Sequence, residues 1–314
     1  MNPHRLAVAT MLTLVALSAL LLGGVATAVT PPTKPSDALG QPRLTLEPAA
    51  TMTVPGVGAG QGVFVHRGFV YLFGDAETGV IREFTWSPEA RYELTPTGRD
   101  IVLTRDGVDI APHPTGLTYH PDFGYLLGDT VRQTGIIFHI DFDRALADGN
   151  LDQAVLNTTI DDLAVNGTRP EFVTLGGEVL VATADYGDVD NEVRLYRPAA
   201  LLKASRTSGE GVLAEAWPAG AFVQSLRWLP GDAESGGEGT LVLVQNMTAG
   251  QGYRLTPTVL GTRDDLRDFP PYDMAETQRE LEGFAPLPFP GAPAILFSAY
   301  AEQNVTFAEI SFEP

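Results

Sequence analysis

The stretch GFVYLFGD (residues 68–75) is written almost again as FGYLLGD (residues 123–129). Each copy is rich in Val, Leu, Phe and Tyr and ends in Gly-Asp, which is the pattern of a β-strand that stops at a turn. Three further apolar runs match them: EVLVATAD (178–185), GTLVLVQN (239–246) and PAILFSAY (293–300). A repeat of this kind predicts that every copy belongs to one supersecondary unit that cannot bury its apolar face alone.

The same period runs through the segments on either side of these runs. With Gln61, Thr115, Glu171, Gln224 and Glu282 as equivalent positions in the preceding segments, the spacings are 54, 56, 53 and 58 residues. A third apolar run follows each copy after a polar turn, at VIREFTW (80–86), GIIFHIDF (135–142), NEVRLYR (191–197), GYRLTPTV (252–259) and VTFAEISF (305–312). Five copies of three hairpin-connected strands predict the blades of a propeller.

The predicted fold is therefore an all-β, five-bladed β-propeller with three to four antiparallel strands per blade. The last repeat stops after its third strand, so we expect RLTLEPAATMTV (43–54) to complete that blade and to close the ring without an unpaired edge. Outer fourth strands are expected at 100–104, 154–160, 212–217 and within 265–274, and short helical turns at 143–149 and 198–204.

The first 28 residues have the form of an export signal. An almost wholly apolar run, Leu6 to Val25, leads to Ala26-Thr27-Ala28, which has the small-x-small form of a signal-peptidase site. We expect a signal peptide at 1–28, a Pro-rich, flexible linker at 29–42 and the propeller at 43–314, in a secreted or periplasmic bacterial protein. The alternative is an uncleaved membrane anchor, because about 20 apolar residues can span a bilayer.

Charge and cysteine content narrow the choice of partners. The formal net charge is -19 and the pI is near 4.5, so the protein repels polyanions, and nucleic acid is excluded as a partner. The chain has no cysteine, so an exported domain must rely on its apolar core instead of disulfides. The partners left open are a glycan, another small molecule or a protein.

A ring of polar residues is expected around the central channel. Gln61, Thr115, Glu171, Gln224 and Glu282 open the first strands of the five repeats, and His113 and Arg169 stand just before two of them. First residues of innermost strands surround the channel of a propeller, where ligands commonly bind. The alternative is that these side chains only line a water-filled channel.

Acidic residues follow the second strands. Asp75 and Asp129 are candidate ligand-binding residues, although Asp is also an ordinary turn former. The cluster DYGDVDN (185–191) brings Asp185, Asp188 and Asp190 together, and such oxygen-rich clusters suit Ca²⁺, although the spacing is not that of an EF-hand.

The segment RGFVYLFGDAE (67–77) resembles the second strand of the five-bladed propellers in the arabinanase, xylosidase and fructosidase clan of glycoside hydrolases. The resemblance implies three carboxylates at the starts of the first three blades. Glu171 matches the acid of that set, whereas Gln61 and the segment His113 to Thr115 stand where two aspartates are expected. A glutamine can neither accept a proton nor attack an anomeric carbon, so these departures count against the clan's mechanism in this chain.

Two functions of different class follow. The first is an exported propeller that binds a glycan, small ligand or protein on the acidic face around its channel, without catalysis. The second is a carbohydrate-active enzyme that uses Glu171 and Glu282 as a carboxylate pair, with Arg169 keeping Glu171 ionised. The missing aspartates favour the first function.

Overall fold

A computed structural model describes residues 43–131, 134–187, 189, 191–230, 239–248, 251–259, 280–289, 291–299 and 302–313, which all belong to one unit, Gln41–Pro314. The described residues form antiparallel sheets arranged as a propeller, as predicted. The expected signal peptide and linker lie outside the described residues. No helix in the described part of the chain has the length and apolar character needed to cross a bilayer.

Each sequence repeat forms one sheet, numbered here from the first repeat to the last. The strands of each sheet are given from the innermost outward. Sheet 1 consists of β2 (Ala59–His66), β3 (Phe69–Asp75), β4 (Gly79–Thr85) and β5 (Thr95–Val102), and sheet 2 of β8 (Pro114–His120), β9 (Gly124–Val131), β10 (Thr134–Ile140) and β11 (Val155–Asp161). Sheet 3 consists of β12 (Glu171–Leu175), β13 (Glu178–Ala184), β14 (Glu192–Tyr196) and β15 (Leu213–Pro218), and sheet 4 of β16 (Val223–Leu229), β17 (Thr240–Thr248) and β18 (Gln251–Val259). Sheet 5 consists of β19 (Leu281–Pro286), β20 (Ala294–Ser298), β21 (Val305–Glu313) and β1 (Arg43–Met52).

The number of complete blades differs from the expected five. The described residues contain four blades of four strands each. Sheet 4 occupies the position of the fifth blade and has three strands in the described residues. The fourth strand expected within 265–274 lies outside the described residues. Two expected helical turns are present as α1 (Phe142–Asp148) and α2 (Pro198–Leu201), and a small ribbon that the sequence did not predict joins β6 (Thr104–Arg105) to β7 (Val108–Asp109).

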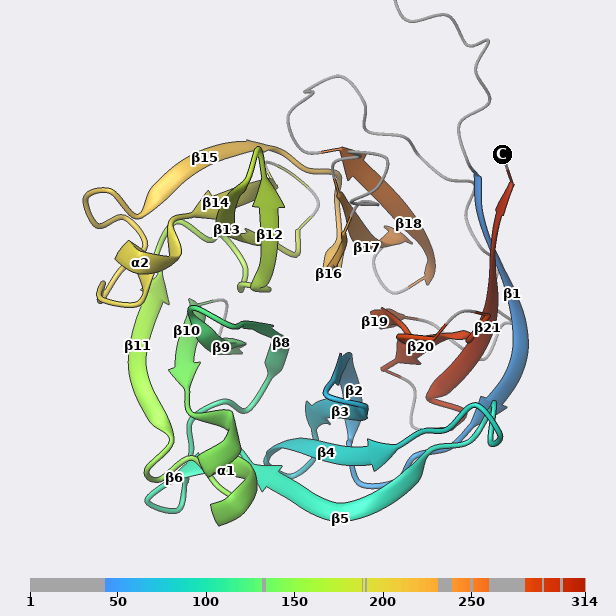
Figure 1. Ribbon diagram of the computed structural model, residues 1–314. Coiled ribbons are helices and arrows are strands. Elements are labelled where there is room, and N and C mark those ends of the chain that lie inside the picture. Colours follow the sequence, from blue (N-terminus) through green and yellow to red (C-terminus); the bar gives the residue numbers. More distant parts are fainter. Residues whose placement is uncertain are drawn as a thin grey trace, which may run out of the picture. The chain divides into compact units, whose positions relative to one another are not determined.

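The innermost strands stand around a central axis (Figure 1). Each innermost strand contacts its two neighbours around the axis: β2 contacts β8 and β19, β12 contacts β8 and β16, and β16 contacts β19. β8 and β16 also contact each other. Apolar side chains fill the spaces between sheets. Between sheets 1 and 5, for example, Val63 and Leu72 pack with Ile295, Phe297 and Phe307, and all five are buried.

The two ends of the described chain pair in sheet 5, as the sequence predicted. β1 runs antiparallel to β21, with partners from Arg43 and Glu313 to Met52 and Val305. Beyond this pairing, the buried Asn304 side chain accepts a hydrogen bond from Val54 N (2.8 Å) and donates one to Val54 O (2.9 Å). Asn304 thereby behaves like one more rung of the strand ladder.

Four of the five innermost strands carry a β-bulge near their start. The residue left without a register partner is Gln61 in β2, Thr115 in β8, Gln224 in β16 and Glu282 in β19. β12 pairs regularly from Glu171 onward. A bulge bends its strand and re-aims the extra side chain, so four of the five polar positions identified in the sequence are special points of the backbone.

Small residues allow the inner strands to approach one another at these bulges. Gly62, Gly116, Ser225 and Gly283 directly follow the four bulged residues. A Cβ atom at Gly283 would lie 2.8 Å from the Cα atom of Gly62, which is too close for any side chain. Sheets 5 and 1 therefore meet backbone to backbone beside the channel.

Candidate functional site

A hollow of about 200 Å³ opens among the starts of the innermost strands. Five of the residues that line it come from five different sheets or the turns that lead into them, and the sequence identified all five. The lining residues are Gln61, His113, Thr130, Asn166, Arg169, Tyr186, Gln224, Glu280 and Glu282. Every lining residue carries a polar group, so this hollow can exchange hydrogen bonds with a ligand, and the Tyr186 ring and the aliphatic parts of the other side chains add apolar contact.

The bulges explain how three sheets place a side chain in the hollow. Gln61, Gln224 and Glu282 are the extra residues of β2, β16 and β19, and each lines it. The other two sheets use residues before the strand begins, which are His113 and Arg169. Equivalent places in the repeat therefore reach the same hollow by two different backbone routes.

Arg169 is the cation of the hollow and is only 5% exposed. Its Nε donates to Gln224 O (2.7 Å), its guanidinium lies 5.8 Å from the centre of the Tyr186 ring, and its Nη1 has no hydrogen-bond partner among the described residues. Burial lowers the pKa of Arg169, and the carboxylate of Glu282 opposes that shift. Arg169 thus lines the hollow and carries a buried donor that no described residue satisfies.

Two carboxyl groups line the same hollow. Burial raises the pKa of Glu282 well above its usual value, and the neighbouring carboxylate of Glu280, which also shares a hydrogen bond with Glu282, raises the pKa further. Asn246 Nδ2 donates to Glu280 Oε1 at 3.5 Å. A carboxylate nearby disfavours a second buried charge, so Glu282 favours its protonated form.

Glu171 lies in a different place from Glu282. It lines a pocket of about 10 Å³ together with Thr115, Arg169 and Arg227, which is room for one water molecule at most. Its Oε1 accepts from Trp228 N (2.9 Å), and its nearest cation is Arg227 at 3.7 Å. Burial raises the pKa of Glu171. Glu171 thus pairs with Arg227 and not with Arg169, the partner that the sequence had predicted. Glu171 and Glu282 also do not share one cavity.

Thr115 faces away from the hollow as well. Its hydroxyl donates to the carbonyl oxygen of Thr168, across the boundary between sheets 2 and 3. Thr115 and Glu171 are therefore packed into the wall around the channel, whereas the other five predicted ring residues line the hollow.

Asp75 and Asp129 hold His113 in place. Asp75 Oδ2 lies 3.0 Å from His113 Nδ1, and Asp129 Oδ1 accepts from His113 N at 2.8 Å. Neither carboxylate lines the hollow. Asp129 is 0% exposed, and burial raises its pKa to about 6. Both residues contact His113, which itself lines the hollow. Their predicted role as ligand-binding residues stays a prediction.

The wild-type protein is expected to lose stability as the pH rises from about 4 to about 7, and the variant Asp129→Asn is expected not to show this loss. The pKa of Asp129 is raised to about 6 in the folded state, so the folded protein keeps the proton of the Asp129 carboxyl group to a higher pH than the unfolded chain does. The stabilisation is complete below the unfolded pKa and is lost as the pH passes the folded pKa. At about 1.4 kcal/mol per pKa unit, the loss is on the order of 3 kcal/mol.

Urea midpoints at about pH 4 and about pH 7 measure this effect. The matched control is Asp122→Asn in the exposed turn between β8 and β9, which is expected to keep the wild-type pH dependence. If Asp129→Asn and wild type lose stability equally between the two pH values, Asp129 ionises in the folded state without a penalty.

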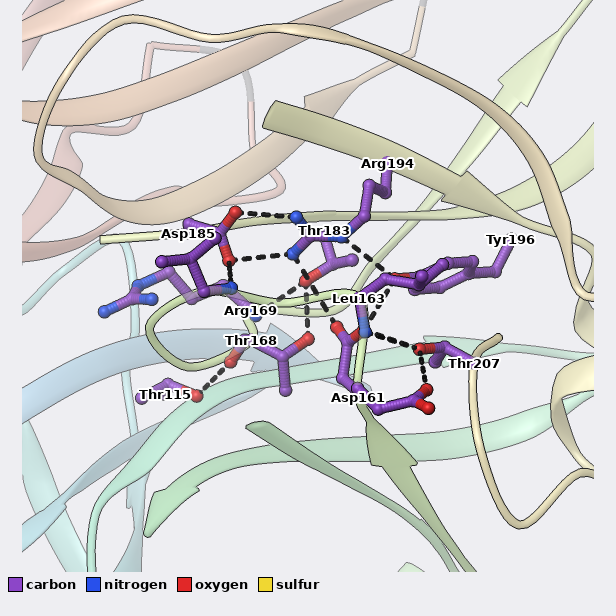
Figure 2. A network of polar contacts seen from close by, with 12 residues as sticks. Thr115, Asp161, Leu163, Thr168, Arg169, Thr183, Asp185, Arg194, Tyr196 and Thr207 are labelled. Carbon is purple, nitrogen blue, oxygen red and sulfur yellow. Dashed lines mark hydrogen bonds and ion pairs between the residues drawn. The ribbon is translucent and has the colours of Figure 1, made fainter. Parts of the chain in front are cut away.

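Asp185 belongs to a buried polar network behind the hollow (Figure 2). Its two oxygens accept from Arg194 Nη1 (2.6 Å) and Nη2 (2.9 Å). Arg194 Nε donates to Tyr196 Oη (2.9 Å), and Tyr196 Oη donates to Asp161 Oδ1 (2.6 Å). Arg194, Asp161 and Asp185 are all buried.

The network also fixes the loop that carries Arg169. Asp185 Oδ1 accepts from Val165 N (3.0 Å), and Thr183 Oγ1 accepts from Arg169 N (2.9 Å). In Figure 2 the guanidinium of Arg169 points away from the Asp185–Arg194 pair. Asp185 is thus a positioning residue for the loop.

The calcium interpretation of 185–191 stays a prediction. Both Asp185 oxygens are engaged by Arg194, and Asp188 and Asp190 lie outside the described residues. Within the described part of the chain, no group of three His, Asp or Glu side chains has the geometry to hold a metal ion. Asp185 alone cannot supply the six to eight oxygens that Ca²⁺ takes.

Sequence reasoning missed four residues of the hollow: Thr130, Asn166, Tyr186 and Glu280. Glu280 carries a usable signal, because it precedes Glu282 by two positions and alternate residues of an extended segment share a face. Tyr186 lies inside the acidic cluster that drew attention as a metal site. Thr130 and Asn166 have no pattern of their own in the sequence.

Comparisons with known proteins do not assign the chain to a family. No family model matches the sequence, and neither does any curated protein. A similar solved structure is an auxiliary nutrient-binding protein from Bacteroides thetaiotaomicron, with 10% identity and a TM-score of 0.43 over 87% of this chain and 78% of that one. The search of family models gives no support to the resemblance to glycoside hydrolases. The propeller assignment therefore rests on the chain's own sheets.

Proposed function

We propose that this protein is an exported, non-catalytic propeller that binds a small polar ligand in the hollow of its central channel. The observation that carries the proposal is the convergence of Gln61, His113, Arg169, Gln224 and Glu282, one from each repeat, on a single cavity. Amides, a hydroxyl, an imidazole and charged groups together provide both donors and acceptors. Such a set recognises a ligand with several hydroxyl, amine or carboxyl groups.

The size of the hollow limits the ligand. Pockets for drug-sized molecules measure about 300–1,000 Å³, and this one measures about 200 Å³. It suits a single small molecule or the terminal unit of a longer glycan. The net charge of -19 further disfavours a strongly anionic ligand.

Placement of the carboxylates favours binding over hydrolysis. Glycoside hydrolases need two carboxyl groups about 5 to 9 Å apart on either side of the bond that breaks. Glu171 and Glu282 line different cavities. Glu280 and Glu282 share a cavity, but they stand two positions apart on one segment, and a glycoside hydrolase needs its two carboxyl groups on opposite sides of the bond.

Wild-type protein is expected to melt about 5 °C higher in the presence of its ligand at a hundredfold excess over Kd. A thermal-shift panel of monosaccharides, oligosaccharides, amino acids, Ca²⁺ and EDTA tests this. Gln61→Ala and Gln224→Ala each remove a neutral donor and acceptor from the hollow, so each is expected to weaken binding about three- to tenfold.

The matched control is Gln153→Ala, which alters an exposed glutamine in the turn after α1. It is expected to leave the ligand-induced shift unchanged. A shift that survives in both Gln61→Ala and Gln224→Ala would place the ligand outside the hollow and contradict the proposal. A shift caused by Ca²⁺ alone would instead support the calcium site around Asp188 and Asp190.

A further inference from the structure

We propose that the hollow takes a zwitterion of amino-acid size, with the ligand carboxylate on Arg169 and the ligand ammonium group on Glu280 and Glu282. This inference rests on the proposed function and names the chemical class of its ligand. It follows from the way charge and unsatisfied donors are distributed inside one cavity.

Arg169 supplies the anion-binding side. The side chain is more than nine-tenths buried, and its Nη1 has no hydrogen-bond partner among the described residues. A buried guanidinium donor without a partner is costly, and a ligand carboxylate at the hollow would satisfy it with a charge-assisted hydrogen bond. The contact between Arg169 Nε and Gln224 O (2.7 Å) already holds the guanidinium in a fixed orientation.

Glu280 and Glu282 supply the cation-binding side. Both line the hollow, and burial together with the neighbouring Glu280 carboxylate raises the pKa of Glu282. A ligand ammonium group can replace the proton on Glu282, since its three N–H donors can reach both carboxyl groups. The proton released in this exchange passes to the solvent.

Only a ligand that carries both a negative and a positive charge can pair with Arg169 and with the two glutamates at the same time. An anion alone would lie close to two carboxyl groups, and a cation alone would lie close to Arg169. The other ionisable groups that act on Glu282 or line the hollow are Asp75, His113 and Tyr186, and Asp75 is already paired with His113 at 3.0 Å. A volume of about 200 Å³ leaves room for an amino acid with a small or medium side chain.

Isothermal titration calorimetry of the full chain tests the inference. The probes are pools of free amino acids, the amine ethanolamine, the carboxylate lactate and neutral monosaccharides, each titrated in phosphate and in Tris buffer. We expect an amino acid to bind at least about tenfold more tightly than ethanolamine or lactate. The difference in heat between the two buffers is expected to show release of up to one proton per ligand bound.

Glu282→Gln keeps the size of the side chain and removes its charge. It is expected to weaken amino-acid binding at least about tenfold and to abolish proton release. Arg169→Gln is expected to weaken binding to a similar degree, and its melting temperature reports whether it folds. The matched control is Glu178→Gln, at an exposed glutamate that opens β13, and it is expected to bind like wild type.

The outcomes separate the inference from the proposed function. If a neutral sugar binds without proton release, depends on Gln61 and is unaffected by Glu282→Gln, the channel site stands and the zwitterion inference is wrong. If an amino acid binds equally well to wild type, Glu282→Gln and Arg169→Gln, the inference is also wrong. If no probe binds, both proposals fail.

Discussion

Arg194→Met is expected to lower the free energy of unfolding by about 3–5 kcal/mol. Arg194 is 1% exposed and is the cation that balances two buried carboxylates, with bonds of 2.6 and 2.9 Å to Asp185 and a distance of 3.8 Å to Asp161. Methionine fills similar space without the charge. Two carboxylates then remain in the interior with no cation, and a buried charge without a partner is far costlier than a lost surface contact. Urea titration measures the change.

The matched control is Arg144→Met, which removes an arginine from an ion pair with Asp148 on the surface of α1. Exposed pairs contribute about 0–1 kcal/mol, so this variant is expected to unfold at nearly the wild-type urea concentration. If both variants are destabilised by the same small amount, the Asp185–Arg194–Asp161 network does not carry the stability assigned to it.

Deletion of Arg43–Met52 is expected to have the second large effect. This strand makes nine cross-strand partner pairs with β21, and such pairs contribute about 0.2–1 kcal/mol each. Their loss costs several kcal/mol and leaves the backbone of β21 as an open edge that can pair with a second molecule. We expect a melting temperature at least about 10 °C lower and a new population of dimers or aggregates.

Differential scanning calorimetry and size-exclusion chromatography measure the two consequences. The length-matched control deletes residues 30–39 of the predicted linker and is expected to melt like wild type. A chain without Arg43–Met52 that melts at the wild-type temperature and stays monomeric would mean that the pairing with β21 contributes nothing to the closed ring.

The fold was readable from the sequence because one pattern is repeated. Runs such as FVYLFGD and GYLLGD place strand, turn and register together, and each became the second strand of a sheet, β3 and β9. The closure by residues 43–52 followed from counting, since the last repeat lacked a strand and an unused strand preceded the first. The count of complete blades was not confirmed, because the fourth repeat shows three strands in the described residues.

Only part of the site was readable, and the reason is the backbone. A polar residue at an equivalent place was visible in each repeat, but the pairing of its strand was not. Glu171 opens a strand that pairs regularly and turns into the wall, whereas Glu282 is the extra residue of a bulge and lines the hollow. The small residue after each bulged position was a signal for the bulge but not for the hollow, because Thr115, followed by Gly116, is also bulged and packs into the wall.

Partners at long range could not be read from the sequence at all. Asp185 stands in an acidic cluster that suggested a metal, and its true partner, Arg194, lies in the next strand with no motif to mark it. In the same way, Arg169 stands two positions from Glu171 but shares the hollow with Glu282. Sequence spacing gives neighbours along a strand, whereas charge pairing between strands and around the channel depends on the folded chain.

The pairing of β1 with β21 also limits the order in which the protein can fold. β1 leaves the ribosome before β21 has been made, and the Val54–Asn304 contact joins residues 250 positions apart. Contacts of such sequence separation form slowly, because a long loop must close before they are rewarded. We therefore expect ring closure to be the late, rate-limiting event of folding. A chaperone that binds β1 until β21 has been made would raise the yield of folded protein without contacting the channel.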